Sequence, residues 1–560
     1  MYDTERNILM SKKIAAGMLC PVLLLTGCQL PFQKDEGDGS GYLFTYTLTE
    51  NPDSLDPQIA KNEAAFMVLR NMMQGLVEEQ PDGTITYGVS SFYSVTEDGL
   101  RYTFTLRDDS YWYHDENRNE AIDEGETWNV TAEDFVFAFQ RMFREETKSP
   151  YREMFRCLAG AEEIISGKAE PDALGVYAEN KNTLVFELAE PCADFLSLLS
   201  LPAAMPCNEA FFEQTSGRYG LDEESVISNN GFYLRRWLYD PYGSDNLIYL
   251  QENSANNTVQ KVYPSDVTFL IRNSQEAAEE AFAAGKADIL ATPYYKAEYS
   301  DAESFTVSSW KSATLGLLLN PDWEAFQNQK IRTALSMAIP RSMFTGETGG
   351  DVEGAYGIVP PETRLGTARY SSYLSEPAIR DTANEDALAL FQEGLSELGV
   401  TSLPSADILM CENMAATEDL YEIVQMWQSL FGFYVGIKTV PESEYNKHLA
   451  EQDYVITLCS ISGKRNNAAS VLETFRTGEN DFGFSVKALD TLLAEVTSAR
   501  DYRELADLCI QAEQIILDEA IFIPVFYKNS YLVHSTRNHD ITYDPYSGEI
   551  QFRSAKYYEN

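Results

Sequence analysis

One stretch of this 560-residue chain carries oxygen-bearing side chains at a spacing that suits a metal ion. The candidate ligands are Asp115, Asn117, Asn119, Asp123 and Glu126. Oxygens on alternate residues, closed by a carboxylate at the twelfth position, suit Ca²⁺, which takes roughly six to eight oxygen ligands. The sixth position is Glu120, although such a loop favours glycine there. The stretch therefore predicts either a structural Ca²⁺ clip or an acidic surface hairpin, with Trp112 and Trp128 packed beneath it.

Sequence motifs for hydrolysis or phosphate chemistry are absent. The chain has no GxSxG, HExxH or GxxxxGK[ST] pattern, and none of its four histidines belongs to such a motif. A catalytic triad assembles in space rather than in sequence, so this search alone leaves a hydrolase open. No motif in the sequence favours an enzyme, and we expect no catalytic activity and no required cofactor.

Six cysteines follow residue 28: Cys157, Cys192, Cys207, Cys411, Cys459 and Cys509. They are widely spaced and contain no CxxC, so neither a zinc site nor a dense disulfide framework is indicated. A single bridge such as Cys192–Cys207 and a set of buried free thiols both fit this spacing.

The N-terminus has the features of an export signal. Two lysines precede an apolar run over residues 14–25, which is too short to cross a bilayer as a helix. Leu25-Thr26-Gly27-Cys28 resembles the lipobox of bacterial lipoproteins, in which the cysteine becomes the acylated N-terminus. We expect residues 1–28 to be a lipoprotein signal peptide, Cys28 to carry acyl chains such as palmitate, and residues 29–41 to be a flexible tether. An ordinary signal with a chance cysteine is the alternative.

The composition limits the partners and the size of the folded body. A net charge of −45 argues against nucleic acid or anionic lipid as a partner and is typical of a solvated acidic surface. Hydrophobic residues make up 44% and aromatic residues 12%, enough for packed cores. A body of roughly 520 residues exceeds the size at which one core stops growing, so at least two lobes are expected.

Strands and helices alternate along the chain. The period-two pattern of a half-buried strand recurs over residues 44–48, 102–106 and 184–188. Helical spacing recurs over 135–143, after a Thr131–Asp134 capping box, and over 388–398, 420–430 and 487–496. Gly399 is placed to end the second of these helices. This mixture indicates α/β lobes.

About a dozen short motifs stand in a familiar order. They include Ser54-Leu55-Asp56-Pro57, Tyr102-Thr103-Phe104, Val130-Thr131-Ala132-Glu133-Asp134-Phe135, Ser149-Pro150-Tyr151, Asn230-Gly231-Phe232-Tyr233 and Ile523-Pro524-Val525. Over residues 42–558 the chain resembles the family 5 solute-binding proteins of peptide and nickel ABC importers, especially the oligopeptide-binding branch. The Ca²⁺-like stretch is an insertion relative to that family.

The resemblance implies a two-lobed, periplasmic-binding-protein-like α/β fold of the class II, cluster C type, with an additional inserted domain. Domain I would comprise residues 42–82, 191–308 and 516–560, domain II residues 83–190, and domain III residues 309–515. Domains I and III would close about a hinge on the ligand. The implied partners are a peptide or other small solute, ABC permease subunits and a membrane reached through the lipid anchor, with no nucleic acid and a monomeric chain on the extracytoplasmic face.

The resemblance also implies a ligand site. Oligopeptide-binding members hold the peptide as an added β-strand, so backbone hydrogen bonds supply affinity without reading side chains. Carried over residue by residue, the site falls on Lys61, Asn62, Glu63, Ser460, Ile461, Ser462 and, at the ligand's amino end, Tyr151.

One position departs from the family pattern. The W-x-x-D-Y motif, whose aspartate receives the peptide α-ammonium, aligns with residues 461–465 and places Lys464 at the aspartate. Two cations about 4 Å apart repel by up to ~4 kcal/mol at an effective dielectric constant of ~20. Lys464 is therefore included among the ligand-binding candidates, as the residue that would change the family's preference for a free peptide α-ammonium.

Three interpretations of Lys464 stay open. The ligand has a blocked, neutral or anionic end; Lys464 points to solvent and Asp453 or Asp481 supplies the anchor; or the protein is an orphan surface receptor. Nickel, heme and oligosaccharide ligands also belong to this class of binding protein, whereas a lipid-anchored hydrolase or an adhesin would be a different class.

Overall fold

The computed structural model describes residues 38–256, 261–344, 352–412, 414, 417–478, 480 and 483–559. The expected signal peptide, the expected lipidation site Cys28, most of the expected tether, and Asp481 lie outside the described residues. Residues from Asp38 onward form one unit. Within the described ranges, no helix combines the length and the apolar character needed to cross a membrane.

The first strand of the described chain, β1, belongs to a four-stranded sheet. Its strands, in spatial order, are β1 (Leu43–Leu48), β12 (Asp266–Ile271), β11 (Leu247–Glu252) and β10 (Phe232–Leu238). β1 runs parallel to β12, and the other neighbours are antiparallel. Phe44, Tyr46 and Leu48 are all buried, which confirms the strand predicted from their period-two spacing.

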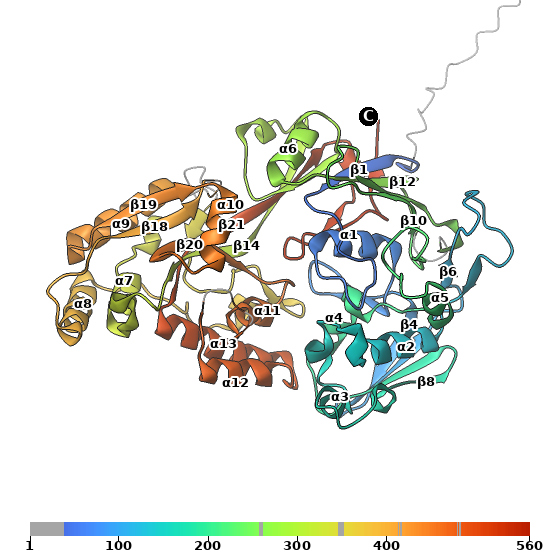
Figure 1. Ribbon diagram of the computed structural model, residues 1–560, viewed down its shortest axis with the longest axis horizontal. Coiled ribbons are helices and arrows are strands. Elements are labelled where there is room, and N and C mark those ends of the chain that lie inside the picture. The colour runs from blue at the N-terminus through green and yellow to red at the C-terminus, as the bar shows by residue number, and fades with distance from the viewer. Residues whose placement is uncertain are drawn as a thin grey trace, which may run out of the picture. The chain divides into compact units, whose positions relative to one another are not determined.

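The largest sheet has seven strands and contains the two longest ones, β14 (Phe305–Leu319) and β21 (Phe522–Ser535). The order is β13 (Ile289–Thr292), β21, β14, β20 (Ile456–Ser462), β18 (Ala406–Cys411) and β19 (Val435–Val440), with β15 (Val352–Gly354) paired to β21. Figure 1 shows β14 and β21 as one long antiparallel pair. Leu532 of β21 packs in one hydrophobic core whereas Ile523 and Val525 pack in another, so this strand joins two cores directly.

A third sheet is antiparallel, with the order β4 (Ser90–Val95), β5 (Arg101–Leu106), β9 (Thr183–Glu187) and β8 (Val176–Asn180). β5 and β9 confirm the strands predicted at 102–106 and 184–188. Two-stranded pairs complete the strands: β2 (Val77–Glu79) with β3 (Ile85–Tyr87), β6 (Tyr111–Tyr113) with β7 (Thr127–Asn129), β16 (Arg364–Leu365) with β17 (Ala368–Arg369), β22 (Asn538–His539) with β25 (Lys556–Tyr557), and β23 (Thr542–Tyr543) with β24 (Ile550–Gln551).

The α-helices are α1 (Glu63–Met72), α2 (Ala132–Phe143), α3 (Ala161–Ile165), α4 (Phe195–Leu199), α5 (Glu209–Gln214), α6 (Gln275–Ala283), α7 (Gln329–Met337), α8 (Asn384–Leu398), α9 (Thr417–Phe431), α10 (Glu442–Ala450), α11 (Ala468–Leu472), α12 (Lys487–Val496) and α13 (Tyr502–Glu519). The four predicted helices are confirmed as α2, α8, α9 and α12. The predicted capping box is present, because the Thr131 N–H donates to Asp134 at 2.8 Å. Gly399 ends α8 with φ 71°, a left-handed conformation that glycine adopts freely.

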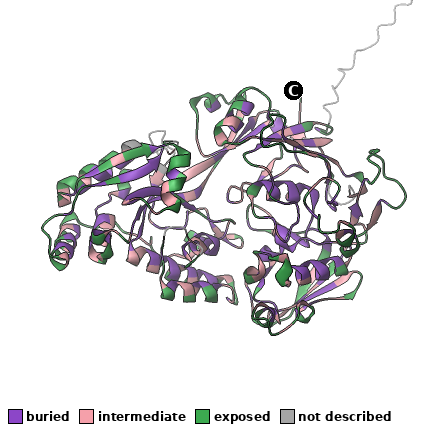
Figure 2. Cartoon of the chain, viewed as in Figure 1, coloured by how far each residue is buried: buried purple, intermediate pink, exposed green. Residues whose placement is uncertain are grey.

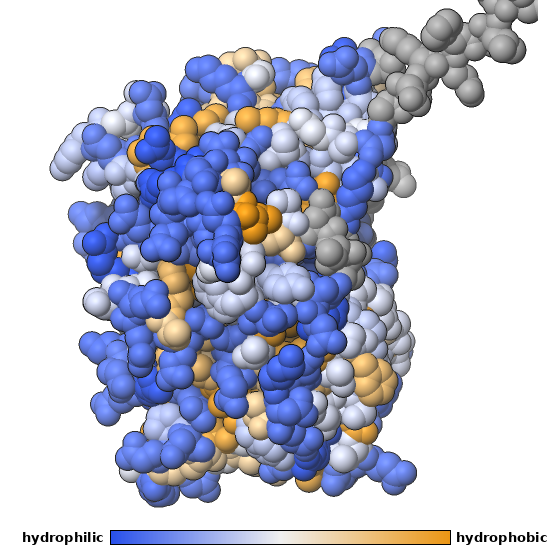
Figure 3. Space-filling model, turned by 90° about the vertical axis from the view of Figure 1, so that its right-hand side faces the viewer, coloured by the Kyte–Doolittle hydropathy of each residue, from blue (hydrophilic) through white to orange (hydrophobic). Residues whose placement is uncertain are grey.

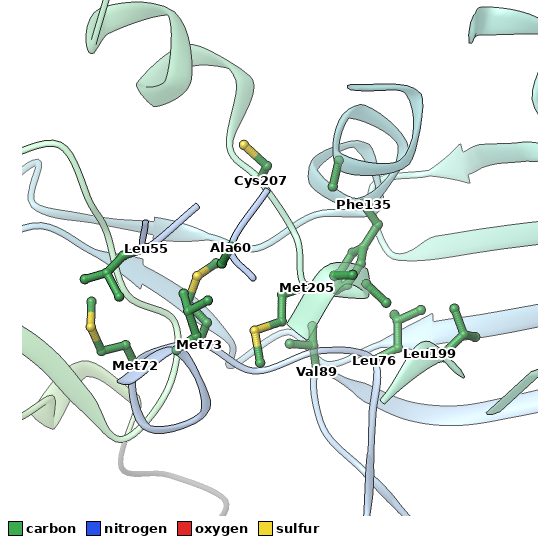
Figure 4. Packing of buried hydrophobic residues seen from close by; sticks show 14 of the residues in the cluster. Leu55, Ala60, Met72, Met73, Leu76, Val89, Phe135, Leu199, Met205 and Cys207 are labelled. Atoms are coloured by element: carbon green, nitrogen blue, oxygen red, sulfur yellow. The ribbon is translucent and has the colours of Figure 1, made fainter. Parts of the chain in front are cut away.

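The cores follow the sheets. Figure 2 shows buried residues concentrated on the strands and on the inner faces of the helices. Figure 4 shows one part of the first core, where Met72 and Met73, next to the end of α1, pack among aliphatic side chains such as Leu55. The face seen in Figure 3 is mainly hydrophilic with scattered apolar residues, in keeping with the net charge of −45. The boundaries expected for the three domains stay predictions.

All six cysteines of the described residues are buried and free. This corresponds to the free-thiol alternative, and the bridge suggested between Cys192 and Cys207 is not formed. Cys192 is hydrogen-bonded to Cys157 instead, and the Cys207 thiol is hydrogen-bonded to Tyr219.

Candidate functional site

The first expected ligand segment, Lys61 to Glu63, forms the entry to α1. The Asn62 side chain caps the helix by accepting from the Ala65 N–H at 3.0 Å and donates to the Asn51 carbonyl at 2.8 Å. The Lys61 N–H donates to the Asp53 carboxylate at 3.1 Å. These bonds hold the segment as a fixed corner, with Lys61 and Glu63 exposed.

Tyr151 lies beside this corner. Its hydroxyl donates to the Ala60 carbonyl, one residue before Lys61. Burial, and then the nearby charge of Asp53, raise the pKa of Tyr151, so the phenol is a neutral donor at physiological pH. The structure therefore brings together two parts of the candidate site that lie about ninety positions apart.

The second expected segment, Ser460 to Ser462, ends strand β20. Ile461 is buried, whereas Ser460 and Ser462 are exposed. One edge of β20 pairs with β14 along its whole length, but the other pairs with β18 only at Ile456 and Thr457. Among the described residues, no strand covers that second edge from residue 459 to residue 462.

The hydrogen-bond alternation shows which backbone groups face the open edge. The Asn320 N–H donates to the Val455 carbonyl at 3.0 Å, so odd-numbered residues of β20 face β14 and even-numbered ones face away. The Tyr445 hydroxyl accordingly donates to the Leu458 carbonyl from the far side at 2.7 Å. Ser460 and Ser462 thus present their N–H and C=O groups at the open edge, ready to pair with an added strand.

The model of the bacterial extracellular solute-binding proteins, family 5, middle region, matches residues 82–483. The chain belongs to this family. Family 5 binding proteins are extracytoplasmic, and the expected class of fold, two-lobed and mixed α/β, is confirmed.

Individual members of family 5 match nearly the whole chain. The oligopeptide-binding protein OppA of Bacillus subtilis is 25% identical and covers 96% of this chain and 98% of its own. The periplasmic murein peptide-binding protein MppA of Escherichia coli is 25% identical over 93% of this chain and 95% of its own. The solved structure of the E. coli murein tripeptide binding protein superposes with a TM-score of 0.71 at 23% identity, covering 93% and 99% of the two chains.

Lys464 follows the open edge of β20. Its N–H donates to the Ser470 hydroxyl at 3.1 Å, and its side chain is exposed, with no ion-pair partner among the described residues. Asp453, a suggested substitute anchor, lies before β20 and pairs with His448 at 3.1 Å. A seven-residue strand spans roughly 23 Å, so β20 holds Asp453 and Lys464 apart at its two ends.

The next residue, Arg465, makes a contact that the sequence did not reveal. Its guanidinium lies 2.7 Å from Asp194, which precedes α4, and both side chains are largely buried. Glu79 of β2 stands in the same cluster and accepts a hydrogen bond from the Ser197 hydroxyl. Burial, and then the charge of Asp194, raise the pKa of Glu79 to about 7. Two carboxylates, one from β2 and one from the residue before α4, therefore lie next to the end of the β20 segment.

The two backbone segments do not contact each other through hydrogen bonds in the described residues, so each is prearranged separately. Lys61 to Glu63 is held by Asp53 and Asn51, and Ser460 to Ser462 by β14. No local pattern in the sequence signals Asp194 or Glu79, because the cluster forms by tertiary contact alone.

The Ca²⁺-like stretch joins β6 to β7, where Trp112 pairs with Trp128 across the two strands. Asp115 accepts from the Asn119 and Glu120 N–H groups at 3.1 and 3.2 Å, and Glu120 takes φ 66°, the left-handed turn of a sixth position. The five expected ligands are gathered in one loop.

The acidic groups of this loop have protein partners in the structure. The Arg235 guanidinium lies 2.8 Å from Asp115, and the Glu126 carboxylate accepts from the Glu116 and Asp123 N–H groups. Within the described residues, no group of three or more His, Cys, Asp or Glu side chains is arranged to hold a metal. In this arrangement Arg235 supplies the positive charge that pairs with Asp115. Binding of Ca²⁺ by the loop stays a prediction.

A cavity of about 350 Å³ opens beside this loop. It is lined mainly by polar and charged side chains from residues 113–118, 223–228 and 233–235. None of the expected peptide-binding residues borders it, so it is separate from the open edge of β20.

Proposed function

We propose that this family 5 protein is the membrane-anchored substrate-binding component of an ABC importer, which captures oligopeptides between its two lobes and delivers them to permease subunits. The observation that carries the proposal is the open edge of β20, where no strand of the described residues pairs with the backbone groups of Ser460 and Ser462 that face away from β14. Relatives named for oligopeptide, dipeptide and murein peptide binding support it, as does the solved structure of Haemophilus influenzae OppA in complex with the peptide RPPGFSPFR. The protein itself performs no catalysis and acts as a monomer.

In this proposal the ligand adds a strand to β20. Its backbone bonds to Ser460 and Ser462 on one side and to the Lys61–Glu63 corner on the other. Backbone pairing binds peptides of many sequences because every residue offers the same N–H and C=O groups. Tyr151, held beside the corner by Ala60, borders the ligand's end.

Lys464 determines which end group is accepted. Its exposed ammonium has no carboxylate partner among the described residues, so it repels a free peptide α-ammonium and attracts an anionic or neutral end. An N-blocked peptide, or a non-peptide solute with such an end, is the alternative ligand that this residue favours. An orphan surface receptor would use the same site without a permease.

Native mass spectrometry of residues 29–560, before and after mild denaturation, tests the proposal. This fragment retains the whole unit that begins at Asp38 and lacks the proposed anchor. We expect a mixed population of released peptides, enriched in blocked or acidic amino ends. Release of one defined non-peptide species would support the alternative ligand, and turnover of added peptides would overturn a binding role.

A further inference from the structure

Two buried thiols of the first core are in hydrogen-bond contact. Cys157 and Cys192 are 2% and 4% exposed. The Cys192 thiol is hydrogen-bonded to the Cys157 thiol and also accepts from the Asp194 backbone N–H. The first of these contacts, followed by burial, raises the pKa of Cys192 well above its ordinary value.

The surrounding backbone holds the two cysteines at this spacing. The Ala189 N–H donates to the Cys157 carbonyl at 2.8 Å, and Leu158 forms a β-bridge with Leu188. The segments that carry the two thiols are therefore paired to each other. Tyr102 lies near both thiols, because burial, and then Cys192 and Cys157, raise the pKa of Tyr102 to about 12.

The segment that carries Cys192 also contacts a third hydrophobic core, which contains Ala499. The Ala193 N–H donates to the Ala499 carbonyl at 2.8 Å, and Asp194 pairs with Arg465 at 2.7 Å. A covalent link at Cys192 would thus fix a segment that connects the first core to this third core and that pairs, through Asp194, with Arg465 next to Lys464.

We propose that Cys157 and Cys192 form a disulfide in the extracytoplasmic compartment and that this bridge anchors the Cys192–Asp194 segment to the first core. Proteins outside the cytoplasm meet oxidising conditions in which disulfides persist. The other cysteine with a hydrogen-bonded neighbour among the described residues, Cys207, contacts Tyr219 rather than a thiol.

The chemistry is two successive thiol–disulfide exchanges with a small-molecule disulfide, RSSR. The Cys192 thiolate attacks one sulfur of RSSR, forming a mixed disulfide and releasing RSH. The Cys157 thiolate then attacks the Cys192 sulfur, forming the protein bridge and releasing the second RSH. The two cysteines are oxidised, RSSR is reduced, and the two thiol protons leave on the two RSH molecules. Because both thiols are buried in the folded state, the exchange takes place during folding.

The test uses the chain exported in its native host and the same chain refolded with oxidised glutathione. Each sample is denatured, alkylated, digested and analysed by mass spectrometry. We expect a linked peptide pair containing Cys157 and Cys192 and alkylation of the other four of the six cysteines. Alkylation of all six, or a bridge to any other cysteine, overturns the proposal.

A second measurement separates the bridge from a packing role of the two thiols. Reduction should lower the thermal midpoint of the wild type by several degrees and speed amide exchange at Ala193, whereas C157S/C192S should not respond to reductant. The matched variant C207S should respond like the wild type. An equal response of C157S/C192S and the wild type contradicts the proposal even where the variants differ in basal stability.

Discussion

In the proposed function, Lys464 is the residue that most affects which ligand is bound. It follows the open edge of β20 with an exposed ammonium, at the position where the oligopeptide-binding pattern has an aspartate. Peptides with a free amino end should therefore bind weakly and N-acetylated ones more tightly. Solvent screening limits the difference to about 1–2 kcal/mol, or roughly tenfold in affinity.

The substitution K464D should reverse this preference. Replacing the cation with a carboxylate should tighten binding of a free-amino peptide by about tenfold or more and weaken its acetylated form. Calorimetric titration of both forms of one peptide from the released pool measures the change. The control K438D alters an exposed lysine on β19, at the far side of β18. Equal effects of the two variants would mean that Lys464 does not face the ligand.

Glu79 should make stability depend on pH. Its pKa rises from 4.5 to about 7 on folding, so the folded state keeps a proton that the unfolded state releases between these values. The free energy of unfolding should consequently fall as pH rises from 4.5 to 7. In E79Q this contribution is absent, so the variant should match the wild type at pH about 4.5 and exceed its thermal midpoint above pH about 7.

Thermal melts of both proteins across this pH range measure the effect. E97Q, which changes an exposed carboxylate between β4 and β5, is the control and should follow the wild type at every pH. A constant difference between E79Q and the wild type across the range would show that Glu79 does not titrate as proposed.

Two proline substitutions test the role of strand β20 in binding the ligand. Proline at Ser462 removes an N–H from the open edge, whereas proline at Ile461 removes one from the β14 ladder. S462P should weaken peptide binding by about threefold to tenfold, the effect of one backbone hydrogen bond, with little loss of stability. I461P should instead lower the thermal midpoint. Calorimetry and thermal melts distinguish the two, and S462P with unchanged affinity would exclude the added strand.

The loop between β6 and β7 is a second element with a testable role. If it binds Ca²⁺, saturating metal should stabilise the protein, by about 2.7 kcal/mol at 100 times the dissociation constant. D123N removes a candidate ligand and should abolish the effect, whereas E124Q changes the neighbouring, non-ligand position and should retain it. Thermal melts with Ca²⁺ or EDTA measure this. If Ca²⁺ leaves the thermal midpoint of the wild type unchanged, the loop does not bind the metal. Arg235 is then the cation that pairs with the acidic loop, through Asp115.

At the scale of the whole molecule, the proposed anchor governs location. C28A should abolish incorporation of labelled palmitate and release the protein from the membrane fraction, because acyl chains supply the membrane affinity. C20A, inside the apolar run of the signal, is the matched control and should stay anchored. Membrane retention of C28A would favour an ordinary signal with a chance cysteine.

Much of the fold could be read from short-range patterns. The strands at 44–48 and 102–106 and the helix at 487–496 were predicted because burial repeats at the period of one element. The candidate ligand segments came from ordered family motifs. Only the strand pairing showed that β20 lies inside its sheet, between β14 and β18. The same pairing showed that the backbone groups of Ser460 and Ser462 face the open edge.

By itself the sequence predicted several of the elements, the family and the lysine at the position of the family's aspartate, since each depends on neighbouring residues or on motif order. Only the tertiary structure decided that Arg465 meets Asp194, 271 positions away, and that Cys192 meets Cys157 rather than Cys207. Such contacts depend on the path of the whole chain. Many remote partners are compatible with one local pattern, and packing of the complete fold selects among them.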